Sequence, residues 1–174
     1  MTTLRIMSWN IEGLENHIPI IDNLLNDNNI DIAGFQEVQC LQTVEDTLNN
    51  ATPSYHTSIS TKDQGRDAIE RLKCANKRQH FGTSITCRKE NEKNLNIIKQ
   101  KNYNIKAARY KIGESKILIL SIYIPTSGKE DKFEKMCDEL GDIICREAVD
   151  STVIEFGDLN IRPRNKKWRK CYKN

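Results

Sequence analysis

The sequence lacks the long apolar segments that would place the chain in or across a membrane. Its longest apolar run, Ile117 to Ile124, has eight residues and is interrupted by Ser121, whereas a membrane-spanning helix needs about 20. The opening residues also lack a basic region followed by an apolar stretch, which a secretory signal would have. We therefore expect an intracellular protein with no membrane span.

The cysteines lack the spacing of a zinc site or of a compact disulfide scaffold. None of the six belongs to a C-x-x-C pair, and zinc knuckles are built on such pairs. Disulfides are rare inside cells, where thiols are kept reduced. We therefore expect six free thiols, at Cys40, Cys74, Cys87, Cys137, Cys145 and Cys171.

Positive charge is unevenly distributed over a chain whose net charge is only +3. Residues 161–174 contain seven Lys or Arg and no acidic residue, and Arg88 to Lys116 contains nine against three Glu. Such clusters favour polyanions such as nucleic acid, although a solvated face explains them as well. The expected contacts with nucleic acid lie in the tail, where Trp168 can stack on a base: Arg162, Arg164, Lys166, Lys167 and Trp168.

The 174 residues suit one folded domain with a short extension. With 37% hydrophobic and 29% charged residues, the composition is far from that of a disordered chain. We expect a domain at residues 1–160 and a basic tail at residues 161–174.

Apolar periodicity predicts alternating strands and helices. A strand at Leu4–Trp9 precedes a helix at Asn16–Asn28, with Asn16 as its N-cap, and a strand at Ile30–Phe35. Further strands are expected at residues 55–59, 81–87, 103–110, 116–124 and 151–156, and further helical segments at residues 41–48 and 129–148. Turn residues at 113–115 predict that the strands at 103–110 and 116–124 form a hairpin.

Acidic and amide side chains follow directly on three of these strands. They are Asn10, Glu37 and the pair Asp158 and Asn160. Each alone is typical of a strand-end cap or turn. Carboxylates brought together repel one another unless a cation neutralises them, and oxygen ligands suit Mg2+ or Mn2+. The pattern therefore predicts a metal site.

Four motifs in order connect the chain with a known family. They are S-W-N-I-E-G-L at residues 8–14, F-Q-E-V at 35–38, S-I-Y-I-P at 121–125 and G-D-L-N at 157–160. The series resembles the endonuclease/exonuclease/phosphatase superfamily, most closely the apurinic-type endonucleases and the endonuclease domains of non-LTR retrotransposons. The resemblance implies an α+β fold, a DNase I-like four-layer α/β/β/α sandwich, and metal-dependent hydrolysis of a phosphoester.

The resemblance also implies roles at the matching positions. Glu37 would ligate Mg2+ (or Mn2+), and Asn10 would orient both the metal site and the phosphate. Asp158 would position or deprotonate the attacking water, and Asn160 would donate a hydrogen bond to a phosphoryl oxygen. Tyr123 would bind the phosphate through its hydroxyl, unless its ring only covers the core.

The sequence departs from the family pattern at two places. Glu12 stands where some members have Asp. The family also places an Asp and an S-D-H-like triplet well beyond G-D-L-N, whereas this sequence continues for 14 residues after Asn160. His17, His56 and His80 come earlier and are expected in ordinary surface or core roles. We therefore expect an incomplete sandwich, the N-terminal two thirds of the domain.

Three functions fit these observations. The first is Mg2+-dependent hydrolysis of phosphodiesters in nucleic acid, expected to be DNA, of the retrotransposon-endonuclease type. The second is an inactive, nucleic-acid-binding remnant. The third is a phosphoesterase acting on a lipid or inositol headgroup, because anionic lipids also attract basic stretches. The sequence predicts neither the substrate among DNA, RNA and small phosphoesters nor the oligomeric state.

Overall fold

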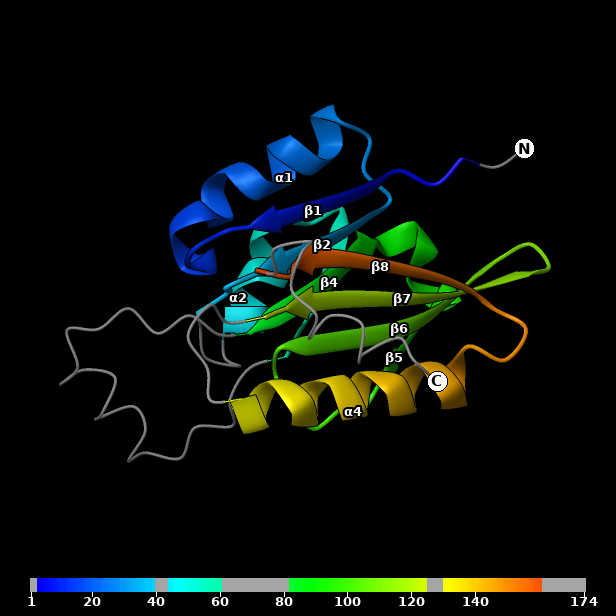
Figure 1. The fold of residues 1–174 in the computed structure, drawn as a ribbon. Helices are drawn as coiled ribbons and strands as arrows, with labels where there is room; N and C mark the ends of the chain where they lie inside the picture. Colours follow the sequence, from blue (N-terminus) through cyan, green and yellow to red (C-terminus); the bar gives the residue numbers. More distant parts are fainter. Residues whose placement is uncertain (1–2, 40–43, 61–81, 125–129, 161–174) are drawn as a thin grey trace, which may run out of the picture.

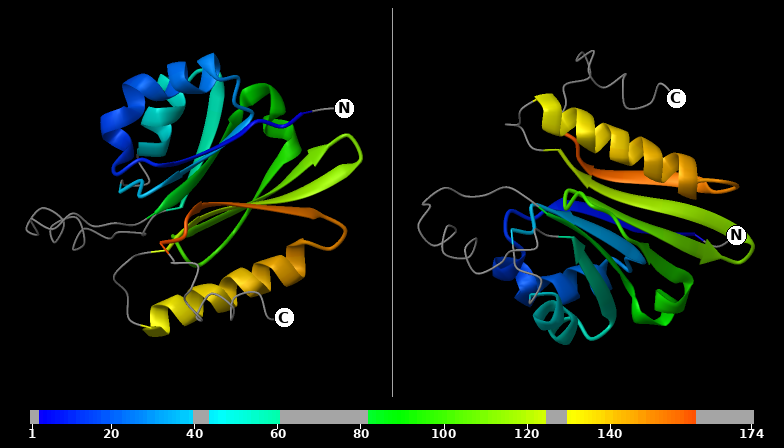
Figure 2. Two further views of the ribbon diagram at one scale, coloured as in Figure 1. Left: turned by 45° about the horizontal axis from the view of Figure 1, so that its top comes forward. Right: turned by 90° about the horizontal axis from the view of Figure 1, so that it is seen from below.

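Two four-stranded β-sheets form the centre of the protein, with helices on their outer sides (Figure 1, Figure 2). The computed structural model describes residues 3–39, 44–60, 82–124 and 130–160. The first sheet has the strand order β1-β2-β4-β3, in which β1 and β2 are parallel and the other pairs are antiparallel. Its strands are β1 (Ile6–Asn10), β2 (Ile32–Gln36), β3 (Tyr55–Ser60) and β4 (Thr83–Arg88).

The second sheet has the order β5-β6-β7-β8, in which β7 and β8 are parallel. Its strands are β5 (Leu95–Ile98), β6 (Ile105–Ile112), β7 (Ser115–Tyr123) and β8 (Thr152–Asp158). The predicted hairpin is confirmed, since β6 and β7 pair antiparallel around Gly113, whose φ of 59° favours glycine. Sequence periodicity missed β5, a four-residue strand that follows a charged 3-10 helix, η2 (Lys89–Asn94).

Helices cover the outer face of each sheet, as both views of Figure 2 show. On the first sheet lie α1 (Ile18–Asp27) and α2 (Val44–Ala51), and on the second lies α4 (Glu130–Glu147). The helices bury apolar stripes because their apolar residues recur at three- and four-residue spacing. The stripe of α1 includes Ile21 and Leu25, and that of α4 includes Met136, Leu140 and Ile143.

Apolar residues pack under the helices on the outer face of each sheet. A third apolar layer lies between the two sheets. The residues of this layer are buried and come from strands of both sheets: Ile32, Ile85, Cys87, Ala108, Tyr110 and Ile119. Helices, sheet, sheet and helix therefore form four layers, and the expectation of an α+β sandwich of the type α/β/β/α is confirmed.

The sheets approach each other closely at Gly34 in β2. A Cβ atom at this position would lie 1.9 Å from a ring carbon of Phe156 and 2.7 Å from Ser121 Oγ. No real side chain tolerates such distances, so glycine allows β2 to pack directly against β8 and β7.

Helix boundaries differ from the prediction at two places. Asn16 is not an N-cap, because a 3-10 turn, η1 (Leu14–His17), precedes α1, and the N-cap position of α1 is His17, without a side-chain cap bond. The second helix continues to Ala51, three residues beyond the expected end at residue 48.

The cysteine prediction is wrong at Cys137, which is disulfide-bonded. Cys87 and Cys145 are free, while Cys40, Cys74 and Cys171 lie outside the described residues. The prediction used spacing along the sequence, whereas disulfide formation depends on proximity in the folded chain. None of the helices in the described ranges is long and apolar enough to span a membrane.

Candidate active site

The polar residues that follow the strands lie together at one end of the two sheets. In the parallel pair β1 and β2, Asn10 is in register with Gln36, the residue before Glu37. In the parallel pair β7 and β8, Tyr123 is in register with Asp158. Asn10 Nδ2 donates to Glu37 Oε1 at 2.9 Å and to Asp158 Oδ2 at 2.7 Å. One amide nitrogen therefore joins carboxylates that come from different sheets.

Glu37 is buried, and its carboxylate is held from several sides. In addition to the bond from Asn10, its Oε2 accepts a hydrogen bond of 3.1 Å from Gln39 Nε2, and the Tyr123 hydroxyl is hydrogen-bonded to the same carboxylate. Gln39 was missed by sequence reasoning, and its position two residues after Glu37 is the one signal that points to it. The carboxylate is thus fixed in orientation before any ligand arrives.

Tyr123 is buried, with its hydroxyl at the carboxylates. Burial raises the pKa of this phenol, and the hydrogen bond and negative charge of Glu37, together with the charge of Asp158, raise it further. The phenol therefore stays protonated at neutral pH and acts as a hydrogen-bond donor.

Asp158 follows Gly157, where the backbone leaves no room for a side chain beside β7. A Cβ atom on Gly157, whose φ is 144°, would lie 1.9 Å from the carbonyl oxygen of Ile122. Beyond Asp158 the chain turns back, and the Asn160 backbone N–H donates to Asp158 Oδ1 at 3.1 Å. Asn160 Nδ2 donates to the carbonyl oxygen of Ile124 at 2.9 Å, so one of its two amide N–H groups is engaged.

Backbone strain is concentrated around these residues. Glu12, Glu37, Gln39 and Asn160 have φ values between 46° and 53°, in the left-handed region that side chains other than glycine seldom adopt. Such conformations cost free energy and persist where the surroundings enforce them, often at functional sites. Here the turn after β2 is fixed by backbone bonds such as Gly13 N to Glu37 O at 2.9 Å.

A polar layer lies between the sheets, directly next to the carboxylates in sequence, and its members Gln36, Thr83 and Ser121 are buried. Ser8 Oγ donates to Gln36 Oε1 at 3.2 Å, and Gln36 Nε2 donates to Ser121 Oγ at 3.2 Å. The Ser121 and Thr83 hydroxyls are 2.6 Å apart. Sequence reasoning did not identify this layer, which links β1, β2, β4 and β7 one residue from Glu37 and two from Asn10 and Tyr123.

The side chains fit a divalent metal ion. Asn10 Oδ1 is buried, and no described residue forms a hydrogen bond with it. It is an unused carbonyl ligand beside two carboxylates, and oxygen donors of these kinds suit Mg2+ or Mn2+. Within the described ranges, no three His, Cys, Asp or Glu residues form a metal cluster, so the site depends on the amide as well as on Glu37 and Asp158.

The remaining residues singled out from the sequence lie elsewhere or outside the described ranges. The ring of His17 packs against Trp9, with centroids 5.1 Å apart, and His56 Nδ1 lies 3.6 Å from Glu92 Oε1. Both have the ordinary roles expected of them. His80 and the five tail residues lie outside the described ranges: Arg162, Arg164, Lys166, Lys167 and Trp168.

The fold is found in several solved structures, although the sequences differ widely. No protein-family model matches the sequence, and no curated protein matches it. An AP endonuclease from Archaeoglobus fulgidus is 18% identical, with a TM-score of 0.66 over 98% of this chain and 69% of that one. The 3′ phosphatase NExo from Neisseria, bound to product DNA hairpin, is 17% identical, with a TM-score of 0.64 over 94% and 60%.

A third solved structure shares the fold. An endonuclease/exonuclease/phosphatase family protein from Bacteroides thetaiotaomicron is 16% identical, with a TM-score of 0.63 over 97% of this chain and 67% of that one. The chain thus spans 60–69% of the length of these three structures. The chain shares the DNase I-like fold of these structures.

Proposed function

We propose that this site belongs to a divalent-metal-dependent phosphodiesterase that acts on nucleic acid, with Mg2+ (or Mn2+) as its cofactor. The observation that carries the proposal is the position of Asn10. Its Nδ2 binds Glu37 and Asp158, carboxylates of two different sheets, while its buried Oδ1 has no hydrogen-bond partner among the described residues. A cation would satisfy this oxygen and neutralise the two carboxylates.

Glu37 and Asn10 would hold the cation. When bound, it would supply Lewis-acid stabilisation of the negative charge on the phosphoryl and leaving oxygens. Gln39 and Tyr123 donate to Glu37, so they would position this ligand rather than bind the metal themselves. The Tyr123 hydroxyl has a single O–H, so it would donate to a phosphoryl oxygen by exchanging its bond to Glu37.

Asp158 would orient the attacking water. Its Oδ1 and Oδ2 each accept one hydrogen bond, from Asn160 N and Asn10 Nδ2. Each carboxylate oxygen has a second lone pair, which a water molecule can use. Asn160 keeps one free amide N–H after its bond to Ile124, and this group would donate to a phosphoryl oxygen as negative charge develops there.

The substrate class rests on the similar structures and on the sequence motifs. TDP2 from D. rerio, complexed with single strand DNA product, is 17% identical, with a TM-score of 0.61 over 97% of this chain and 64% of that one. Together with NExo bound to its DNA hairpin, it favours DNA. The motif series adds the retrotransposon-endonuclease type to the proposal, and the basic residues 161–174 would contact the nucleic-acid backbone.

Nicking of supercoiled plasmid tests the proposal. We expect the purified chain to nick DNA with Mg2+ and not with EDTA, and Glu37→Gln or Asp158→Asn to reduce the rate by about 100-fold or more. The matched control is Glu114→Gln, which neutralises an exposed carboxylate in the β6–β7 hairpin turn. Nicking that persists in EDTA or in Glu37→Gln would refute the proposed site.

A folded chain that does not nick DNA would exclude hydrolysis of DNA by this chain. Circular dichroism establishes the fold, and fluorescence anisotropy with a labelled oligonucleotide then separates the alternatives. Salt-dependent binding without nicking would identify the nucleic-acid-binding alternative.

A further inference from the structure

The outer face of the second sheet changes from apolar to cationic where α4 ends. Under the helix, this face is apolar and includes Leu118 and Leu120. Because side chains alternate along a strand, Arg109 and Lys111 of β6 and Lys116 of β7 lie on the same face, towards the β6–β7 hairpin. These three side chains are exposed, so an uncovered cationic surface continues the covered apolar one.

The two lysines of this surface face each other directly. Lys111 and Lys116 are paired in the antiparallel register of β6 and β7. Like charges at directly opposed positions repel and destabilise a sheet. Neither lysine forms an ion pair with any acidic side chain that the structure describes. The pair therefore carries positive charge that an anionic ligand would stabilise.

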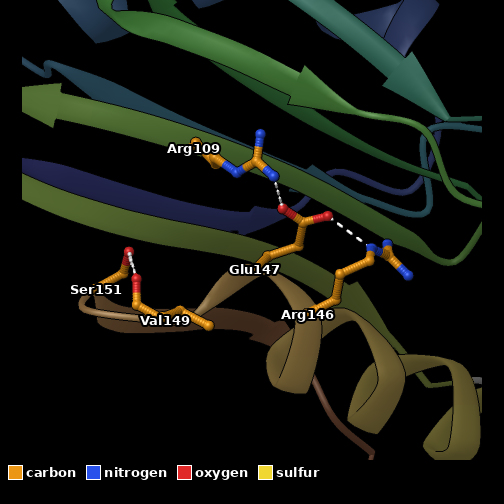
Figure 3. Close-up of polar contacts among 5 residues, drawn as sticks. All are labelled: Arg109, Arg146, Glu147, Val149 and Ser151. Carbon is orange, nitrogen blue, oxygen red and sulfur yellow. Dashed lines mark hydrogen bonds and ion pairs between the residues drawn. The ribbon is translucent and has the colours of Figure 1, made fainter.

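A buried carboxylate at the end of α4 holds Arg109 and one further cation, Arg146, in place. Figure 3 shows the Glu147 carboxylate between the guanidinium groups of Arg109 and Arg146. Arg109 Nη2 donates to Glu147 Oε2, and Arg146 Nε donates to Oε1 at 2.7 Å. Glu147 is buried, but more than half of each arginine side chain is exposed. A guanidinium has five N–H groups, so both arginines retain donors for a ligand.

These residues line one hollow of about 390 Å³. Among the described residues that line it, Arg109, Lys111, Lys116 and Arg146 are cationic and Glu147 is the one acidic residue. A second hollow of about 310 Å³, along the exposed side of α4, contains three acidic side chains beside its lysines and Arg146. The excess of positive charge thus distinguishes the first hollow, which we name the hairpin hollow.

We propose that the hairpin hollow binds a phosphate group. The arginines would supply paired N–H donors in a planar arrangement that matches phosphate oxygens, and the lysines would supply point charges. Nucleic-acid backbone and free phosphate esters share this chemistry. Lys116 lies seven residues before Tyr123 on β7, which is about 23 Å at roughly 3.3 Å per residue. The hollow is therefore separate from the candidate active site and does not depend on hydrolysis there.

Thermal denaturation with inorganic phosphate tests the site. We expect phosphate to raise the Tm of the wild-type chain more than chloride does at the same ionic strength, because a ligand that binds only the folded state stabilises it. The double variant Lys111→Ala/Lys116→Ala should lose this extra rise. In low salt without phosphate, its Tm should equal or exceed that of wild type, since the lysine repulsion is removed.

The control removes two lysines from the other hollow. Lys99→Ala/Lys101→Ala takes away the same charge beside Asp138 and Glu139, and it should keep the phosphate-specific rise. Equal effects of phosphate and chloride on wild type, or an undiminished phosphate effect in Lys111→Ala/Lys116→Ala, would overturn the proposal.

A second measurement identifies the source of the phosphate. Binding of a fluorescein-labelled DNA oligonucleotide is followed by anisotropy in EDTA, so that no cleavage interferes. If backbone phosphates occupy the hollow, the double variant binds more weakly. The negative slope of log K against log salt then decreases in magnitude by about 1.4 for two lost contacts to single-stranded DNA. If small phosphates occupy it, the phosphate effect on Tm is lost while oligonucleotide binding is unchanged. Both binding measurements are independent of whether the chain nicks DNA.

Discussion

Asn10 and Asp158 are 148 residues apart in the sequence, yet Asn10 Nδ2 donates to Asp158 Oδ2 at 2.7 Å. The same nitrogen donates to Glu37 at 2.9 Å. An amide is neutral, so it joins the two carboxylates without compensating their charge. This arrangement makes the stability of the site sensitive to any cation bound there and to any charge added at position 10.

Asn10→Asp should make folding dependent on divalent metal. The substitution removes the shared donor and places a third negative charge beside Glu37 and Asp158. In EDTA we expect the free energy of unfolding to fall by about 1–3 kcal/mol, and saturating Mg2+ to restore most of it. Thermal denaturation with and without Mg2+ measures both effects. Asn23→Asp, on the exposed side of α1, is the control, and equal Tm values for Asn10→Asp and wild type in EDTA would contradict the prediction.

The raised pKa of Tyr123 predicts a loss of stability at alkaline pH. Below the ordinary tyrosine pKa of about 10, the phenol is protonated in both the folded and unfolded states. Above it, the unfolded chain releases the proton while the folded chain retains it, so the free energy of unfolding falls as pH rises. Burial raises the pKa of Tyr55 and Tyr110 as well, so Tyr123→Phe should weaken this dependence without abolishing it.

Two measurements check the alkaline effect. Absorbance at about 295 nm follows tyrosine ionisation, and urea unfolding at several pH values above about 10 gives the slope of stability against pH. If Tyr123→Phe and wild type have the same slope, the Tyr123 phenol has the same pKa in the folded and unfolded states.

The same substitution at two glycines should have opposite effects on stability. Gly34→Ala would place a methyl group 1.9 Å from the ring of Phe156, and we expect the sheets to separate locally at a cost of about 1–3 kcal/mol. Gly141 lies within α4, and a Cβ atom there would meet nothing within 4 Å. Gly141→Ala should stabilise by up to about 1 kcal/mol, because alanine favours helix. Urea denaturation compares the variants, and an unchanged midpoint for Gly34→Ala would contradict the close packing.

Gln39→Ala should weaken metal binding more than it weakens the fold. The side chain donates to Glu37 Oε2 at 3.1 Å, and loss of such a supporting bond typically lowers metal affinity about 10- to 100-fold. Isothermal titration with Mn2+ gives the affinity, and the Mg2+ concentration required for half-maximal nicking gives a second value. Gln39→Glu also removes the donor but adds a negative charge near the cation, so it should bind Mn2+ more tightly than Gln39→Ala at low ionic strength. Unchanged affinity in Gln39→Ala would show that Gln39 does not position the ligand.

Most strands and the convergence of their ends could be predicted from the sequence. Alternating and continuous apolar runs are local signals, and polar residues placed after parallel strands share one sheet edge because of the geometry of strands. Asn10, Glu37 and Asp158 follow this rule, since β1 with β2 and β7 with β8 form parallel pairs. The layer order came from the family resemblance rather than from periodicity.

The features that could not be predicted depend on contacts between distant segments. The Gln36–Ser121 bond crosses from one sheet to the other, and the disulfide at Cys137 likewise depends on the folded arrangement. Gln39 has no periodic signal, because its role follows from the turn that Glu37 makes with φ at 53°. The N-cap assignment of Asn16 failed since a 3-10 turn occupies the expected first turn of α1.

The two carboxylates of the site are supplied by opposite halves of the sandwich. Glu37 follows a strand of the first sheet and Asp158 ends a strand of the second, so neither sheet alone contains the pair. A cation held by Glu37 and Asn10 would reduce the repulsion between the two carboxylates across the sheet boundary, so its binding free energy would add to that of packing the sheets against each other. Metal removal would therefore loosen the joint between the halves before it disturbed either of them.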